Sequence, residues 1–232
     1  MRKSAGKLNI LSTSSQRSAF FGLLLGGGFG GGSAGGLAGW LAGWPVVAAG
    51  GRAASLRLAE AEAAAVVYEA IKVGYRHFDS ACDYGNERSV GAGIQRALNE
   101  GLCERSDLWI TSKLWNTYHH PDRIEKALER TLTDLGLEYL DLYLIHFPIA
   151  LAFVPFETRY PPEWTFDPEA VMPVMVPEKV TLADTWRGME QLKSKGYARH
   201  IGVANYNSGL LHDLMIFAEF GGEVLQIESH PF

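Results

Sequence analysis

The sequence predicts an α/β fold whose parallel strands form a (β/α) barrel. From about residue 59 onward, segments with helical periodicity alternate with short apolar runs that suit buried strands. Strands joined through helices of this length are expected to run parallel, because antiparallel neighbours need only a tight turn. Asp79, Lys113 and His146 each close one of the apolar runs, at steps of 34 and 33 residues. A step of about one βα unit favours a barrel over a doubly wound sheet.

Local signals place the individual elements along the chain. The first helix is rich in alanine and ends at Gly74, and Asn86 is expected to cap the second helix ahead of Glu87. Pro121 suits the first position of the third helix, and a Pro-rich, aromatic excursion at 148–180 precedes the fourth. Helices are expected at 59–74, 86–101, 120–137, 182–196 and 208–221, and strands at 75–80, 107–114, 139–147, 199–205 and 224–231.

Composition limits the class of protein. The 232 residues are 47% hydrophobic and 20% charged, which is enough for a substantial core and excludes a disordered tail protein. A formal net charge of −5 offers no basic field for a phosphodiester backbone, so nucleic acid is not an expected partner. Cys82 and Cys103 indicate free thiols in a reducing, cytoplasmic compartment, with a disulfide between them as the alternative.

The segment 18–51 is uncharged and glycine-rich, and three interpretations compete for it. A flexible insertion is favoured. A membrane span would suit its length and its small-xxx-small spacings, but glycine adds little apolar area for lipid, and membrane association is not expected. A phosphate-binding loop rests only on G-x-G-x-x-G matches that glycine density alone produces. The predicted domains are therefore an N-terminal segment at 1–17, an insertion at 18–58 and a barrel domain at 59–232.

Four polar residues are expected to meet at one end of the sheet. Asp79, Lys113 and His146 end parallel strands, Tyr84 lies just beyond the first strand, and such ends converge on the mouth of a barrel. Taken singly, they could be a turn former, a snorkelling lysine, a core histidine and a packed ring. Together they predict a proton-donating tyrosine. The Lys113 ammonium would lower the pKa of the phenol, Asp79 would keep Lys113 charged, and His146 would hydrogen-bond a substrate oxygen.

The remaining candidates for chemistry are weaker. His119 and His120 precede Pro121 and suit a helix cap, while His77 shares the face of Asp79 and suits barrel filling. No histidine shows the spacing of a metal ligand, so no metal site is expected. A nucleophilic cysteine or serine is not expected either, because no G-x-S-x-G occurs and neither cysteine ends a strand beside a base.

Five motifs in order resemble the aldo-keto reductase superfamily. They are "GYRHFDSACDYGNE", "TSKLWNTYHH", "LDLYLIHFP", "IGVANYN" and "LQIESHP", while "HFPIALAFVPFETRYPP" and "VTLADTW" are similar to xylose (aldose) reductase-like members. The resemblance covers roughly residues 59–232. It implies a (β/α)8 barrel of the TIM type that reduces an aldehyde or aldose carbonyl with NADPH, with NADH as the alternative cofactor. It also implies a small-molecule carbonyl substrate and a cytoplasmic monomer or dimer.

The resemblance assigns roles to individual residues. Tyr84 matches the general acid, Lys113 and Asp79 the residues that tune it, and His146 the residue that orients the carbonyl. Cofactor-binding positions of the family match Asn205, Gln226 and Asp79, and substrate-binding positions match Trp115, His146 and Tyr84. Simpler interpretations stay open: Asn205 as a turn residue, Gln226 as a strand residue and Trp115 as core.

The sequence also departs from the family pattern. Ala204 stands where the family has a serine before Asn205, and "RSAFFGLLL" resembles only the beginning of the family's first strand. The family barrel continues past the position of Phe232 with two more strands and a basic loop for the 2′-phosphate of the cofactor. The expectation is therefore an incomplete barrel, with about six of eight βα units, a degraded first strand, two unpaired sheet edges and weak NADPH binding. The alternative to an active reductase is an inactive fragment, the product of a gene-model error or a pseudoenzyme.

Overall fold

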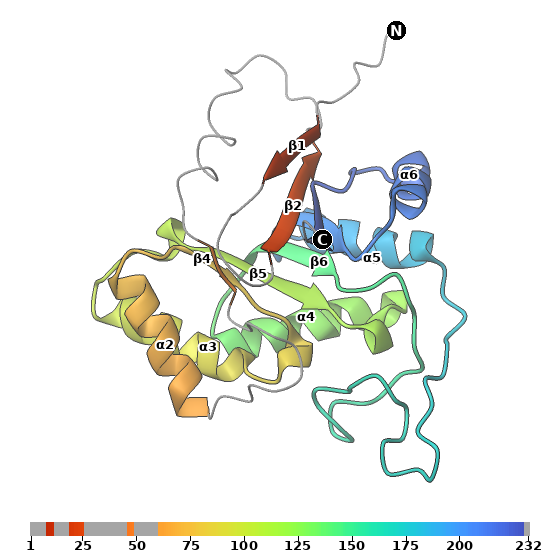
Figure 1. Cartoon of the computed structure of the whole chain (residues 1–232), viewed down its shortest axis with the longest axis horizontal. Coiled ribbons are helices and arrows are strands. Elements are labelled where there is room, and N and C mark those ends of the chain that lie inside the picture. Colours follow the sequence, from red (N-terminus) through yellow and green to blue (C-terminus); the bar gives the residue numbers. More distant parts are fainter. Residues whose placement is uncertain (1–7, 12–18, 26–45, 49–59, 230–232) are drawn as a thin grey trace, which may run out of the picture.

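A curled sheet with helices against one face forms the fold in the computed structural model, which describes residues 8–11, 19–25, 46–48 and 60–229 (Figure 1). The strand order is β1-β2-β8-β7-β6-β5-β4-β3, and β3 to β8 pair in parallel. The strands are β1 Leu8–Leu11, β2 Ala19–Leu25, β3 Val46–Ala48, β4 His77–Asp79, β5 Trp109–Leu114, β6 Leu140–Ile145, β7 Ala198–Ala204 and β8 Val224–Ser229. The helices are α2 Glu60–Lys72, α3 Glu87–Asn99, α4 Pro121–Leu135, α5 Leu182–Ser194 and α6 Ser208–Phe217.

The elements expected from residue 59 onward are confirmed, with local differences at helix ends. The helix expected at 208–221 ends at Phe217, because Ala218 is already extended. Asn86 occupies the N-cap position of α3, as predicted. Its side chain makes no hydrogen bond to the first turn, so the prediction that it caps the helix is wrong. His120 does cap α4, its Nδ1 accepting from the main-chain N–H of Asp122 at 3.3 Å. His119 is no cap but a fully buried side chain.

Side-chain alternation divides the strand residues between the two faces of the sheet. The helix-facing set packs into the main core and includes Phe78, Ile110, Tyr143, Ile145, Ile201 and Val203. The opposite face carries a small separate cluster of Leu142, Leu144 and Ala204, against which Trp109 and Val224 pack. The polar residues predicted for the site fall on this second face. Their side chains therefore lie away from the helices, on the inner side of the curl.

Helix α3 lies between α2 and α4, close to both (Figure 1). A Cβ atom added at Gly91 would lie 2.6 Å from the main chain of Leu135, and one at Gly93 would lie 2.5 Å from the carbonyl oxygen of Ala64. Real side chains do not make contacts this short, so these two glycines permit the close approach of the three helices. The first turn of α3, directly after the loop that carries Tyr84, is thereby fixed in place.

The edge beside β8 differs from the sequence prediction. The strand expected from "RSAFFGLLL" is present as β2, but it runs antiparallel to β8, from Ala19 opposite Ser229 to Leu24 opposite Val224. β1 adds antiparallel to β2, and β3 pairs in parallel with β4. The prediction of an unpaired edge at β8 is therefore wrong, because a strand from the amino-terminal part of the chain occupies it. Periodicity could not reveal this pairing, since it joins segments about 200 residues apart.

The glycine-rich block is only partly described. β2 and β3 fall within 18–58 and join the sheet, while 26–45 and 49–58 lie outside the described residues. The division into an insertion and a barrel domain stays a prediction. Within the described residues, no helix has both the length and the apolar character that crossing a bilayer requires. Cys82 and Cys103 are free, so the disulfide alternative is wrong.

Candidate active site

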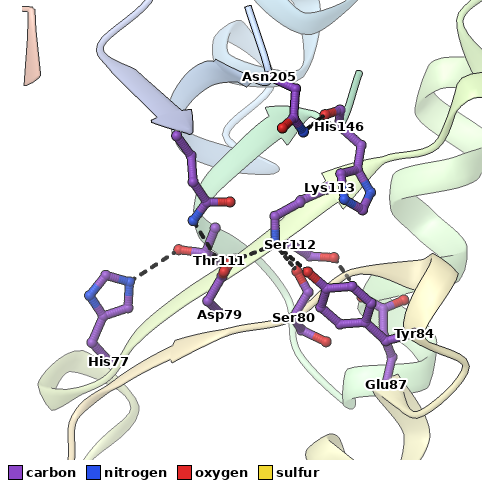
Figure 2. Close-up of polar contacts among 11 residues, drawn as sticks. His77, Asp79, Ser80, Tyr84, Glu87, Thr111, Ser112, Lys113, His146 and Asn205 are labelled. Carbon is purple, nitrogen blue, oxygen red and sulfur yellow. Dashed lines mark hydrogen bonds and ion pairs between the residues drawn. The ribbon is translucent and has the colours of Figure 1, made fainter. Parts of the chain in front are cut away.

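A buried ion pair forms the centre of the site (Figure 2). Lys113 on β5 is 1% exposed, and its Nζ lies 2.7 Å from Oδ1 of Asp79 at the end of β4. The same ammonium donates to the main-chain carbonyl oxygen of Ser80 at 2.8 Å. The parallel register of β4 and β5 puts these strand ends side by side. The predicted partnership of Asp79 and Lys113 is thus present in the structure.

Tyr84 reaches the same ammonium from the loop after β4. It ends a 3-10 turn over Cys82–Tyr84, and Gly85 then takes a left-handed conformation with φ of 67°. Glycine adopts this conformation without strain, which lets the chain turn directly into α3. The Tyr84 hydroxyl lies 3.5 Å from Nζ of Lys113, at the outer limit of a hydrogen bond. Nζ also lies 5.1 Å from the centroid of the phenol ring.

Burial and the ion pair decide the protonation states at this centre. Burial lowers the pKa of Lys113, but the Asp79 carboxylate and the Tyr84 oxygen outweigh it, so the net pKa is raised and the ammonium stays charged. Burial raises the pKa of Tyr84, and Lys113 lowers it by a smaller amount. The direction predicted for the effect of Lys113 is confirmed. The prediction that the phenol titrates below its ordinary range is wrong for this structure, because burial dominates.

His146 stands at the end of β6 among aromatic rings. Its ring lies edge-on to those of Tyr84 and Trp115, with centroids 6.0 and 5.2 Å away, and stacks on Phe147 at 4.7 Å. Burial, together with the nearby charge of Lys113, lowers the pKa of His146 to about 2. The imidazole is therefore neutral near pH 7 and can donate a hydrogen bond from one nitrogen only.

Trp115 is placed differently from the prediction. It is fully buried, its indole N–H donates to the carbonyl oxygen of Glu163 at 3.1 Å, and its ring meets that of Trp164 edge-on. In this structure the indole therefore packs against His146 and presents no open surface to a ligand. Its role as an aromatic wall of a substrate pocket stays a prediction.

Asn205 and Gln226 lie at the same rim of the sheet. Asn205 follows β7 with φ of 61°, and its Nδ2 donates to the carbonyl oxygen of His146 at 2.8 Å. Gln226 on β8 donates from Nε2 to Oδ2 of Asp79 at 3.1 Å. In the described part of the chain, no hydrogen bond reaches the side-chain oxygen of either residue. Two amide oxygens at the rim are thus available to a ligand that donates N–H groups.

The sequence and structure are related to known proteins along most of their described length. The model of the aldo/keto reductase family matches residues 47–232. The chain belongs to the aldo/keto reductase family. It is 52% identical over 174 residues to an NADPH-dependent D-xylose reductase of Meyerozyma guilliermondii, covering 75% of this chain and 54% of that protein. It is 48% identical over 167 residues to an NADPH-dependent aldose reductase of Saccharomyces cerevisiae, covering 72% and 51%.

Solved structures of aldo/keto reductases support the same fold. A Bombyx mori aldo-keto reductase in complex with NADP matches with a TM-score of 0.67 and 36% identity, covering 79% of this chain and 53% of that one. An aldose reductase of Giardia lamblia matches with a TM-score of 0.68 and 37% identity, covering 76% and 56%. The chain spans about half the length of the curated relatives it matches. The predicted incomplete (β/α)8 barrel is confirmed.

Sequence reasoning missed several groups at the site of this aldo/keto reductase. The Ser80 carbonyl is a main-chain acceptor, which residue type cannot reveal. Phe147 directly follows His146 and could have been found from that position, whereas Trp164 comes from the irregular excursion and had no periodic signal. Glu87 was considered only as a charge in the first turn of a helix, but it is a buried hydrogen-bonded carboxyl. Among the described residues, no group of three or more His, Cys, Asp or Glu side chains could hold a metal ion.

Proposed function

We propose that this aldo/keto reductase reduces the carbonyl group of an aldose or a similar small aldehyde to the alcohol, with NADPH as reductant and NADH as the alternative. The relatives named as NADPH-dependent xylose and aldose reductases support the substrate class and the cofactor. The observation that carries the proposal is the placement of the Tyr84 hydroxyl beside the Lys113 ammonium, which the Asp79 carboxylate holds.

Tyr84 is the group best suited to donate the proton. Lys113 is charged and bonded to Asp79 and to the Ser80 carbonyl, so releasing its proton would leave Asp79 without its cation. His146 is neutral, so it can donate a hydrogen bond but has no acidic proton to give. The phenol is protonated at neutral pH and partly exposed. As the Tyr84 proton moves to the carbonyl oxygen, the Lys113 ammonium stabilises the phenolate that forms.

The rim residues fit the nicotinamide end of the cofactor. Its carboxamide carries an NH2 group, and the side-chain oxygens of Asn205 and Gln226 are acceptors on the same rim. The bound cofactor would supply a hydride to the carbonyl carbon, which together with the proton from Tyr84 completes the reduction. His146 would hold the carbonyl oxygen, and Trp115 would keep the His146 ring in place. The cytoplasmic location and the monomeric or dimeric state stay predictions.

Activity of the full chain tests the function directly. NADPH oxidation is measured with D-xylose and with glyceraldehyde for the parent, Tyr84→Phe and Tyr118→Phe. Tyr118 is a matched control, because it also ends a 3-10 turn after a strand and its buried hydroxyl has no hydrogen-bond partner among the described residues. We expect Tyr84→Phe to lose turnover by about 10²- to 10⁴-fold and Tyr118→Phe to keep it. Equal turnover in Tyr84→Phe and the parent would refute the proton donor. A folded parent that oxidises no NADPH would refute the activity and favour the inactive fragment.

A further inference from the structure

A buried carboxyl group lies beside the site and has no part in the proton transfer. Glu87 is in the first turn of α3, three residues after Tyr84, and is 3% exposed. Its Oε1 accepts a hydrogen bond from the Ser112 hydroxyl at 2.6 Å. Its Oε2 accepts from the Thr131 hydroxyl at 3.0 Å and, more weakly, from the Tyr160 hydroxyl at 3.5 Å. One carboxyl group thus joins α3 to β5, α4 and the 148–180 excursion.

The bond to Ser112 attaches Glu87 to β5 at the residue that precedes Lys113. Successive side chains of a strand point to opposite faces, so Ser112 points toward the helices while Lys113 points to the inner side of the curl. Figure 2 draws the bond between Ser112 and Glu87 together with the contacts that Lys113 makes with Asp79 and Tyr84. Only two residues separate Tyr84 from Glu87 in the chain. The carboxyl therefore sets how far the Tyr84 loop can lie from the lysine-bearing strand.

We infer that Glu87 is a positioning residue that ties the Tyr84 turn to β5, so that the Tyr84 hydroxyl stays within reach of the Lys113 ammonium. The Tyr84 hydroxyl oxygen and Nζ of Lys113 are already 3.5 Å apart, so a small outward movement of the turn would break their contact. This role rests on the reductase function proposed above and adds a residue to it.

The surroundings of Glu87 require a side chain that can hydrogen-bond two hydroxyl groups. The ionisable groups that face it are Cys82 and Tyr160 from loops, Lys113 on β5, Asp134 on α4 and Tyr143 on β6. Within the described residues Glu87 forms no ion pair, since Lys113 is committed to Asp79. Burial raises the pKa of Glu87 to about 7, although the bonds from Ser112 and Thr131 lower it in part. Glutamine has the same shape and can bond both hydroxyls, whereas alanine can bond neither.

The protonation of residue 84 itself provides a test that does not depend on turnover. 3,5-Difluorotyrosine, a more acidic phenol, is placed at position 84 of the full chain, and its ¹⁹F signal is followed against pH. Burial raises the pKa of this phenol by more than Lys113 lowers it, so an outward movement that exposes the ring should lower the ¹⁹F midpoint, although it also weakens the contact with Lys113. We expect a fall of about 1 pH unit in Glu87→Ala and in Ser112→Ala, and a midpoint near that of the parent in Glu87→Gln.

Glu190→Ala is the matched control. Glu190 is also a buried carboxyl, 8% exposed, and its Oε1 accepts from the main-chain N–H groups of Glu219 and Phe220, away from the site. Its loss should lower stability and leave the ¹⁹F midpoint of residue 84 unchanged. In the unlabelled enzyme, Glu87→Ala should lower kcat by about 10²-fold, as expected for a displacement of about 1 Å, with a smaller change in KM.

Each result separates the positioning role from the function. Parent-like midpoints in folded Glu87→Ala and Ser112→Ala would refute the positioning role, whether or not the parent is active. If Glu87→Ala does not fold, the ¹⁹F midpoint of Ser112→Ala alone tests the positioning role, because this variant leaves α3 and the Glu87 carboxyl unchanged. An inactive parent whose midpoint still depends on Glu87 would refute the reductase function and keep the positioning role.

Discussion

The amide nitrogen of Gln226 lies 3.1 Å from Oδ2 of Asp79, although 147 residues separate the two in the chain. Gln226 is on β8 and Asp79 on β4, and β7, β6 and β5 lie between those strands. A flat sheet would keep these side chains several strand widths apart. Their contact therefore shows how strongly the sheet curls, and it links the rim that carries Asn205 and Gln226 to the ion pair.

Loss of this link should destabilise the curled sheet. Gln226→Leu removes a hydrogen bond to a buried carboxylate, so we expect the free energy of unfolding to fall by about 1.5–3 kcal/mol in a urea titration. Gln95→Leu is the control, because the Gln95 amide makes an exposed bond to the Gly136 carbonyl oxygen. Gln95→Leu should lower the free energy of unfolding by no more than about 0.5 kcal/mol. Equal losses in the two variants would show that the cross-sheet bond adds nothing.

Lys113→Met should be among the most destabilising single changes at the site. It leaves the buried Asp79 carboxylate without its cation, so we expect a loss of about 3–5 kcal/mol. The double variant Lys113→Met with Asp79→Leu removes both charges and should recover much of that loss. Chemical denaturation of the parent, both single variants and the double variant measures the coupling. Additive losses would contradict a tightly coupled pair.

His119 should make the fold sensitive to acid. It is fully buried, neither ring nitrogen has a hydrogen-bond partner among the described residues, and burial lowers its pKa to about 3. Below pH ~6.5 His119 therefore binds a proton in the unfolded chain but not in the folded chain. The free energy of unfolding thus falls as the pH drops.

His119→Leu removes the contribution of His119 to this sensitivity, while that of His146 remains, and it also removes the unpaired polar atoms. We expect a more stable protein at pH 5 and a slope of stability with pH that is smaller by up to about 1.4 kcal/mol per pH unit. Thermal unfolding between pH 4 and 7 measures it. His212→Leu, at an exposed position on α6, should leave the slope as it is. A slope in His119→Leu that equals the slope of the parent would assign the acid sensitivity to other groups.

Ala204→Ser should strengthen cofactor binding if the proposed function holds. Ala204 ends β7 beside Asn205 and is 1% exposed, and a hydroxyl there restores the donor of the family pattern. One added hydrogen bond of about 1 kcal/mol corresponds to about a five-fold tighter NADPH complex, which fluorescence quenching can measure. Ala198→Ser, at the opposite end of the same strand, should not tighten it. Unchanged affinity in Ala204→Ser would mean that this hydroxyl makes no bond to the cofactor.

Gly91→Ala should destabilise the helix layer, although alanine is the better helix former. The new methyl group would lie 2.6 Å from the main chain of Leu135, so α3 and α4 must separate. We expect a cost of about 1–3 kcal/mol in chemical denaturation. In Gly209→Ala the nearest atom is 3.3 Å away and belongs to a side chain, so that variant should be neutral or slightly stabilising. The reverse order would show that the α3–α4 contact can relax.

Local sequence signals predicted much of the fold and the centre of the site. Alternating periodicity located β4 to β8 and the helices between them, and the convergence of parallel strand ends then brought Asp79, Lys113 and His146 together. Tyr84 followed from its short distance to Asp79 along the chain. These are short-range or topological properties, which residue type and spacing determine.

Other features depend on relationships that spacing does not contain. The pairing of β2 with β8 joins distant segments, and its antiparallel sense is set by backbone contacts. The net rise in the pKa of Tyr84 depends on how deeply the phenol is buried. Trp115 and Trp164 meet because the irregular excursion folds over the strand ends, and Glu87 bonds to side chains from three other parts of the chain.

The strand β2 also affects how the sheet can interact with other molecules. Because β8 pairs with β2 from Val224 to Ser229 and with β7 from Val224 to Gln226, it is not an outermost strand of the described sheet. In the described part of the chain, the outermost strands are β1, with four residues, and β3, with three. A second molecule that added a strand to either outermost described strand would pair with only three or four residues, and short edge strands are one way in which natural proteins limit intermolecular β-pairing.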